Sequence, residues 1–403
     1  MPDGYVSPAQ EPGPSPSETA RLDRPPGGGA VVPGSVGLDS LFLFRESLRI
    51  GVMDGNPELE FGRIGPMAVD GRGWIHVFDR LRSDVRVFDG EGALVRVIGR
   101  GGSGPGEFSP DVQTMVFAGG DSLLVEDPVV RRRLTFGPEG EHLGTRRLLP
   151  GDGTARLWRI HPEGCLVEQH RRFGGPETGE WLVCREVGGG VRDTLAFFEY
   201  PVFQSNTPPV PLLGPRPLWA VLEDGSVVYG VSGPELDVTR IQPDGRVLNR
   251  IQDDLPPRPI GAEDRAILED RFREDWAQAS GQRIDGLPVA FPEVYPAMLR
   301  LLPGPGNTLW VQRMGSPEEV GGLDLLSPMD EPVAGGEWRV YSAEGRHLGV
   351  TRFPPGFQPR IYREGRYYGV HTDALGVQRV VRLEISPREW GVPGPPSAKV
   401  SDP

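Results

Sequence analysis

The chain has 403 residues, a formal net charge of −13 and a pI of about 5.1. Such an acidic surface repels phosphate backbones and argues against a nucleic-acid partner. With 57 glycines, 44 prolines and 37% hydrophobic residues, the composition predicts many short strands separated by turns. The sequence contains no apolar run of about 18 residues, so it predicts no transmembrane helix. The start shows no charged segment followed by an apolar one, so no signal peptide is visible and the compartment stays open.

The two ends of the chain are rich in proline, glycine and serine. Residues 1–37 and 391–403 offer too little apolar surface to offset the loss of chain entropy on folding. We therefore expect a disordered tail at each end and one folded domain at 38–390.

A pattern of four short strands recurs between these tails. Its clearest copy spans residues 65–99, with turns of Asp and Gly that suit tight hairpins. The four strands predicted there are 66–70, 74–78, 84–88 and 93–98. The first hairpin of the unit occurs six times, at 67–79, 115–127, 157–169, 218–232, 299–313 and 360–372. Repeated strand quartets indicate an all-β, six-bladed propeller with four-stranded antiparallel blades, because stacking in a ring covers both faces of each sheet.

Two further elements fall outside the regular repeat. The last unit ends with strands near 358–362, 366–372 and 377–385, and the strand at 41–52 precedes the first unit. We expect this N-terminal strand to close the last blade, because it would pair with an edge that is otherwise open. Residues 261–280 have a helical pattern with acidic residues in the first turn. They predict one helix inserted between blades 4 and 5, either as a packing lid or as a cap beside a site.

The two cysteines, Cys165 and Cys184, are too few for a disulfide framework or a zinc site. They fall on two strands that we expect to be neighbours. Pairing Phe173 with Trp181 in this hairpin leaves the cysteines out of register, which predicts two free thiols.

The segment IGRGGSGPGEFSP at residues 98–110 is similar to the junction between NHL repeats, in which Gly-x-Gly-Pro-Gly-x-Phe precedes the next inner strand. Over residues 38–390 the chain resembles bacterial 6-bladed β-propeller proteins of the NHL-repeat-like type. The resemblance implies a recognition scaffold, although relatives include lactonases and lyases. Many relatives are exported, which favours a periplasmic or cell-envelope location. Either Gly104 or Gly106 is expected to adopt a positive φ in the tight junction.

The ends of the second strands are the candidate ligand-binding positions. If each blade runs from the inside outwards, these ends lie on the same face as the connections between blades. The equivalent positions are Asp79, Asp127, Gln169, Val231, Arg313 and His371. The five polar residues would form a rim around one mouth of the central channel, where Arg313 suits a carboxylate or phosphate and the two aspartates suit a cation. The alternative is that strand ends are polar wherever they meet water.

No set of catalytic residues is recognisable. A calcium-dependent lactonase needs several carboxylates around the axis, and only Asp79 and Asp127 occupy the ring. The six histidines are scattered among blades, and no nucleophile, phosphate-loop or metalloprotease motif occurs. We expect a monomeric, non-enzymatic binding or scaffold propeller that recognises a protein or small ligand and has no resident cofactor or metal. The alternative is a lactonase-like hydrolase or lyase at the channel mouth, with calcium as the metal to consider.

Overall fold

The computed structural model describes residues 41–118, 121–148, 154–160, 165–172, 179–186, 190–198, 209–319, 325 and 336–387. The predicted tails at 1–37 and 391–403 lie outside these residues. Within the described part, no helix is long and apolar enough to cross a membrane.

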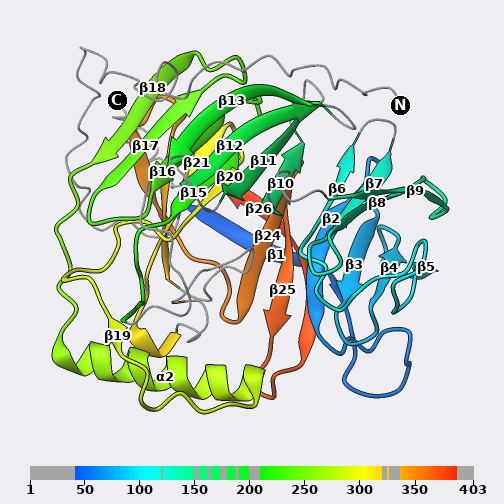
Figure 1. Cartoon of the computed structure of the whole chain (residues 1–403). Helices are drawn as coiled ribbons and strands as arrows, with labels where there is room; N and C mark the ends of the chain where they lie inside the picture. Colours follow the sequence, from blue (N-terminus) through cyan, green and yellow to red (C-terminus); the bar gives the residue numbers. More distant parts are fainter. Residues whose placement is uncertain are drawn as a thin grey trace, which may run out of the picture.

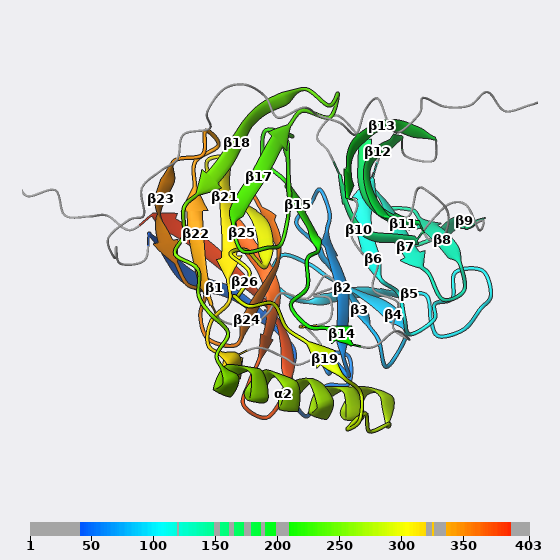
Figure 2. The same cartoon turned by 60° about the vertical axis from the view of Figure 1, so that its left-hand side comes forward.

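The described strands form six four-stranded antiparallel sheets arranged as a ring, which confirms the predicted six-bladed propeller (Figures 1 and 2). Blade 1 consists of β2 (Ile64–Val69), β3 (Ile75–Asp79), β4 (Asp84–Phe88) and β5 (Leu94–Ile98). Blade 2 consists of β6 (Thr114–Ala118), β7 (Ser122–Asp127), β8 (Arg132–Phe136) and β9 (His142–Arg147). Blade 3 consists of β10 (Thr154–Ile160), β11 (Cys165–Arg172), β12 (Gly179–Glu186) and β13 (Val191–Phe198). Blade 4 consists of β15 (Pro217–Val221), β16 (Val227–Val231), β17 (Leu236–Ile241) and β18 (Val247–Asp253). Blade 5 consists of β20 (Arg300–Gly304), β21 (Thr308–Arg313), β22 (Glu337–Tyr341) and β23 (His347–Thr351).

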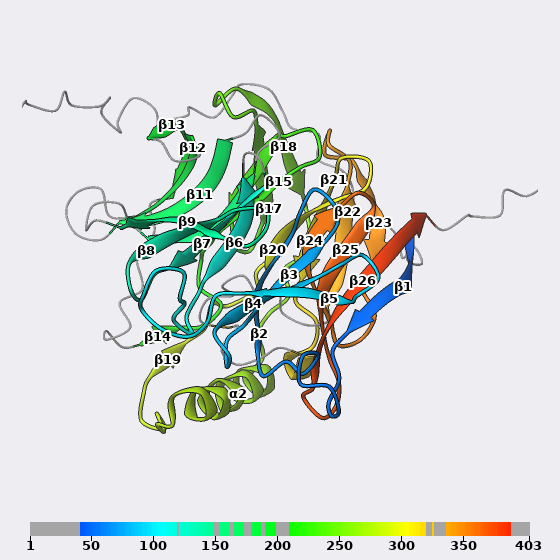
Figure 3. The same ribbon diagram turned by 90° about the vertical axis from the view of Figure 1, so that its right-hand side faces the viewer.

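Blade 6 is completed by the N-terminal strand, as predicted. It contains β24 (Phe357–Arg363), β25 (Arg366–Thr372), β26 (Gln378–Pro387) and β1 (Phe42–Ile50). The antiparallel register of β1 and β26 runs from the pair Phe42 and Pro387 to the pair Ile50 and Val380. Figure 3 shows the first and last strands of the chain side by side. The propeller is therefore closed by main-chain hydrogen bonds between its two ends.

The core lies between neighbouring blades, because each blade has an apolar side chain on both faces of its middle strands. Every residue of β3 is buried, whereas the outer strand β5 is partly exposed. Phe78 of blade 1 packs edge-to-face against Phe108, which in turn contacts Phe136 of blade 2. The innermost strands of successive blades contact one another all the way round the ring. A single blade could not bury these faces alone.

Cys165 and Cys184 form a disulfide, so the prediction of two free thiols was wrong. The predicted register was the cause. In the structure Cys165 lies opposite Glu186 and Cys184 lies opposite Val167, an odd-numbered shift from the expected pairing. Such a shift moves side chains to the other face of the sheet. The cysteines thereby become diagonal neighbours on one face, with their Cα atoms 5.7 Å apart.

A small cap is attached to one end of the propeller. It contains the predicted helix, α2 (Ala262–Ser280), the parallel pair β14 (Val210–Pro211) and β19 (Val289–Ala290), and the 3-10 turn η1 (Pro317–Glu319). Leu268 and Phe272 of α2 are completely buried in a cluster that includes Leu299 and Met314 at the ends of blade 5 strands. The cap therefore packs directly on the propeller, at the lower end of the molecule in Figure 2. We call this end the capped end.

Candidate functional site

The second strands end at the capped end, together with the connections from each blade to the next. In blade 1, Asp79 at the end of β3 lies opposite Ile64 at the start of β2. In blade 5, Met314 directly after β21 is part of the buried cluster of the cap. The topology that we predicted for the candidate positions is therefore present. The contacts of each candidate show whether its side chain is bound within the fold or is available to a ligand.

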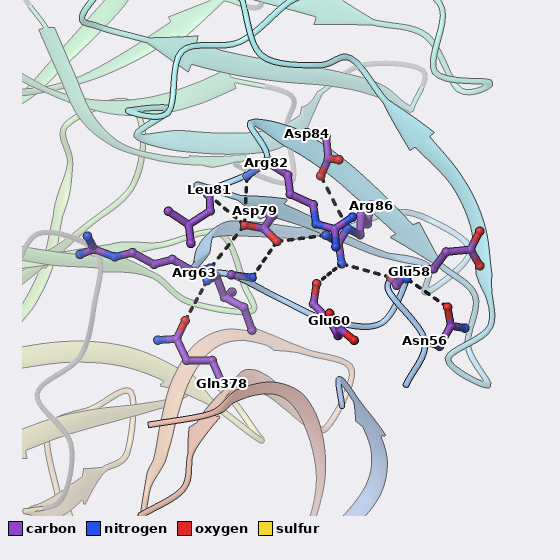
Figure 4. Close-up of polar contacts among 12 residues, drawn as sticks. Asn56, Glu58, Glu60, Arg63, Asp79, Leu81, Arg82, Asp84, Arg86 and Gln378 are labelled. Atoms are coloured by element: carbon purple, nitrogen blue, oxygen red, sulfur yellow. Dashed lines mark hydrogen bonds and ion pairs between the residues drawn. The ribbon is translucent and has the colours of Figure 1, made fainter. Parts of the chain in front are cut away.

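Asp79 is completely buried, and its carboxylate accepts hydrogen bonds from its own blade (Figure 4). The backbone N–H of Gly62 donates at 3.0 Å, that of Leu81 at 3.0 Å, and the Arg86 guanidinium at 3.1 Å. Arg86 also donates to the carbonyl oxygens of Glu58 and Glu60, at 3.1 and 2.7 Å. This pair fastens the incoming connection to the turn between β3 and β4. Such a carboxylate is already satisfied by the fold.

Asp127 repeats the same arrangement in blade 2. It accepts hydrogen bonds from the backbone N–H of Ser109 at 2.9 Å and the Ser109 hydroxyl at 2.6 Å, and lies 3.5 Å from the guanidinium of Arg132. Arg132 donates to carbonyl oxygens of the preceding junction, among them Ser103 at 2.7 Å and Glu107 at 2.6 Å. The Gly-Pro-Gly junction thus wraps around a guanidinium. Gly106 has a φ of 72° in this loop, which confirms the expected positive φ at one of the two glycines.

Gln169 is buried between blades 3 and 4. Its carbonyl oxygen accepts a hydrogen bond from the indole N–H of Trp219 at 2.8 Å, and its amide donates to the carboxylate of Glu180. Both polar groups of the side chain therefore have partners within the core.

Arg313 differs from these three residues. It is half-buried at the end of β21, opposite Glu337, yet no carboxylate among the described residues lies within ion-pair distance of its guanidinium. Burial lowers its pKa, and the positive charges of Arg339 and Arg258 lower it further, against the opposite effect of Glu337. Arg258 comes from the connection that carries the cap and donates to the carbonyl oxygen of Met314 at 2.7 Å. Positive charge is thus concentrated at this position.

His371 is also half-buried, at the end of β25. Its Nδ1 atom is 3.4 Å from Nη1 of Arg49 in β1. Burial lowers the pKa of its imidazole, and the Arg49 charge acts in the same direction. The apolar member of the ring, Val231, is 39% exposed.

The five polar candidates therefore share one end of the propeller but do not form a connected cluster. No hydrogen bond or ion pair among the described residues joins any two of them. Sequence reasoning missed Arg86, Arg132 and Arg258. The first two could have been found, because each is an arginine in the third strand that follows a second-strand aspartate. Within the described part of the chain, no group of three or more His, Cys, Asp or Glu side chains could hold a metal ion.

A family model and two solved structures agree with the fold. Residues 54–148 match the model of a family described as 6-bladed beta-propeller. A candidate exported protein from Bacteroides fragilis is 12% identical with a TM-score of 0.54, covering 89% of this chain and 98% of that one. A member of the duf4221 family from Bacteroides vulgatus is 13% identical, also with a TM-score of 0.54, covering 87% and 99%. A gluconolactonase from Xanthomonas campestris is 10% identical with a TM-score of 0.45, covering 90% and 99%. No curated protein matches the sequence.

Proposed function

We propose that this six-bladed β-propeller is a non-enzymatic recognition module that binds a carboxylate or phosphate group at its capped end, with Arg313 as the anchoring cation. This proposal rests on a difference among the candidate residues at the ends of the second strands. Asp79, Asp127 and Gln169 are used by the fold, whereas Arg313 has no carboxylate partner among the described residues.

Electrostatics support this role for Arg313. Burial and two neighbouring arginines make its charge unfavourable in the unliganded protein. An incoming anion would offset this cost, and a guanidinium can bind both oxygens of a carboxylate or phosphate at once. A hydrogen bond to such a charged group contributes about 1.5–3 kcal/mol. His371, at the same position in the adjacent blade, is the second polar group that we assign to ligand contact.

A thermal-shift screen of carboxylate and phosphate metabolites, followed by calorimetric titration, tests the proposal. We expect at least one anionic compound to stabilise the wild type and to lose most of that effect in Arg313→Ala. Arg283→Ala is the matched control, because Arg283 is an arginine on the cap connection that is 81% exposed and paired with Asp285. Unchanged binding by a correctly folded Arg313→Ala protein would contradict the proposal.

The disulfide supports an oxidising compartment, because such bonds are reduced in most cytosols. We therefore propose that the protein works in the periplasm or cell envelope. Fractionation of the native host, with thiol labelling of the denatured protein before and after reduction, tests this. Recovery in the cytosol with two reactive thiols would contradict it. We also predict that the protein is a monomer, and light scattering in solution tests this.

A further inference from the structure

Three turns at the capped end expose large apolar side chains. Leu375 in blade 6 is 78% exposed, Leu81 in blade 1 is 75% exposed, and Val129 in blade 2 is 62% exposed. All three lie between the second and third strands of their blades, and these blades are consecutive in the ring. None of the three belongs to the buried cluster of the cap, which draws on the connections before and after blade 4 and on blade 5. We call Leu375, Leu81 and Val129 the apolar rim.

Hydrogen bonds hold the tips of the rim in fixed positions. The backbone N–H of Leu81 donates to Asp79 at 3.0 Å, and that of Leu375 donates to Asp373 at 2.9 Å. Across the Val129 tip, the backbone N–H of Arg131 donates to the carbonyl oxygen of Pro128 at 3.1 Å, and Arg131 has a left-handed φ of 51°. The apolar side chains are therefore presented by ordered turns. Binding to them would cost little backbone entropy.

The rim is flanked by positive charge. Arg63 and Arg82 are exposed, and no carboxylate among the described residues is within ion-pair distance of either. The carbonyl oxygen of Arg63 accepts a hydrogen bond from the backbone N–H of Arg80, next to Leu81. Figure 4 shows that the side chains of Arg63 and Leu81 both point away from the network around Asp79. This local positive charge contrasts with the net charge of −13 of the whole chain.

We propose that the apolar rim docks a protein partner through an acidic segment that also carries apolar side chains. The exposed Leu and Val tips supply apolar contacts across three blades, and Arg63 and Arg82 complement carboxylates. Charges act over about 8 Å at physiological salt, so a short acidic segment responds mainly to the rim. A broad anionic membrane would instead face the acidic remainder of the molecule, which disfavours a lipid surface. This surface is separate from Arg313 and does not depend on its role.

The partner class can be tested with a phage-displayed library of random twelve-residue peptides selected against the wild-type protein. We expect the enriched peptides to combine Asp or Glu with large apolar residues. Their Kd, measured by fluorescence anisotropy, should weaken about tenfold or more in the triple variant Leu81→Ser, Val129→Ser and Leu375→Ser. It should also weaken in Arg63→Glu with Arg82→Glu, and in higher salt for the wild type. The matched control replaces Val95, Val97 and Leu143 with serine, which are 39%, 51% and 57% exposed on outer strands.

Several results would overturn the proposal. These are enrichment of no peptide family, enrichment of peptides without acidic residues, or an unchanged Kd in the triple variant. Co-sedimentation with phosphatidylglycerol vesicles that the triple variant loses would assign the rim to lipid instead. Circular dichroism and thermal unfolding establish that each variant is folded. If the triple variant does not fold, Leu375→Ser and Leu81→Ser are measured singly, with the same criterion of a weakened Kd.

Discussion

Arg339 in blade 5 donates to the carboxylate of Asp253 at the end of blade 4, at 2.9 Å. The hydroxyl of Tyr341 donates to the same carboxylate at 2.6 Å. In blade 1 the corresponding guanidinium, Arg86, is instead paired with Asp79 of its own blade. The buried guanidinium of blade 5 therefore takes its hydrogen-bonded carboxylate from the neighbouring blade, while Glu337 of its own blade lies 3.7 Å away. At the ring position of blade 5 stands Arg313, and no carboxylate among the described residues lies within ion-pair distance of its guanidinium.

Replacing Asp79 with Ala should destabilise the propeller strongly. The change removes the carboxylate that accepts a hydrogen bond from the Arg86 guanidinium, whose side chain is 1% exposed, and leaves Asp84, at 3.6 Å, as its ion-pair partner among the described residues. Breaking a buried pair costs about 3–5 kcal/mol. Urea unfolding followed by tryptophan fluorescence measures the loss. Asp54→Ala, at an exposed acidic position, should unfold like the wild type. A loss below about 1 kcal/mol for Asp79→Ala would show that the pair is not needed.

Removing the disulfide should lower stability by about 3 kcal/mol, because it closes a loop with a sequence separation of 19 residues. The experiment compares urea unfolding of the wild type and Cys184→Ala, each with and without dithiothreitol. Reductant should lower the stability of the wild type towards that of the variant and leave the variant unchanged. A wild-type protein that does not respond to reductant, and has two titratable thiols when denatured without it, would refute the bond.

Acid should weaken the contact between blades 2 and 3 through Glu168. Burial alone would raise the pKa of this carboxyl, but the hydrogen bond with His170 and the charges of Arg133 and Arg185 lower it to about 2. Since the folded-state pKa is below that of the unfolded chain, the stabilisation is complete above about pH 4.5. It is lost as the pH falls towards 2.

Urea unfolding at pH 6, 4 and 3 measures this pH dependence. Glu168→Gln should be less stable than the wild type at pH 6, and the difference should shrink at pH 3. Glu139→Gln is the control, because Glu139 is 73% exposed. Parallel stability curves for the wild type and Glu168→Gln across this range would argue against a lowered pKa.

Truncation tests the closure of the ring. A chain that begins at residue 53 lacks β1, so the hydrogen-bonding edge of β26 is open, and we expect aggregation. A chain that begins at residue 38 keeps β1 and should retain the melting temperature of the full chain. Light scattering and calorimetry on both proteins distinguish these outcomes. Greater damage from the shorter deletion would show that the predicted domain boundary is wrong.

The fold could be predicted because each blade repeats the same strand pattern, with the same residue types in its turns. The N-terminal strand β1 and the helix α2 could be predicted because their segments lie outside the repeated strand pattern. The disulfide could not be predicted in the same way, because it depends on the exact register of one hairpin. The ring positions were found by alignment, but their partners were not. Asp79 and Arg86 lie on adjacent strands with a sequence separation of 7, but Arg339 pairs with Asp253 of the neighbouring blade, 86 residues away, and the strand pattern does not indicate that contact.

The pairing of β1 with β26 also sets an order of events during synthesis. The ribosome makes β1 first, yet its partner strand extends to Pro387, so β1 must wait unpaired until almost the whole domain has emerged. At typical translation rates of about 5–20 residues per second, this delay is on the order of tens of seconds. Blades 1 to 5 can assemble one after another on the nascent chain, but the ring closes only when β26 has been made and pairs with β1. Interrupted translation would therefore release an open arc with a free strand at its start.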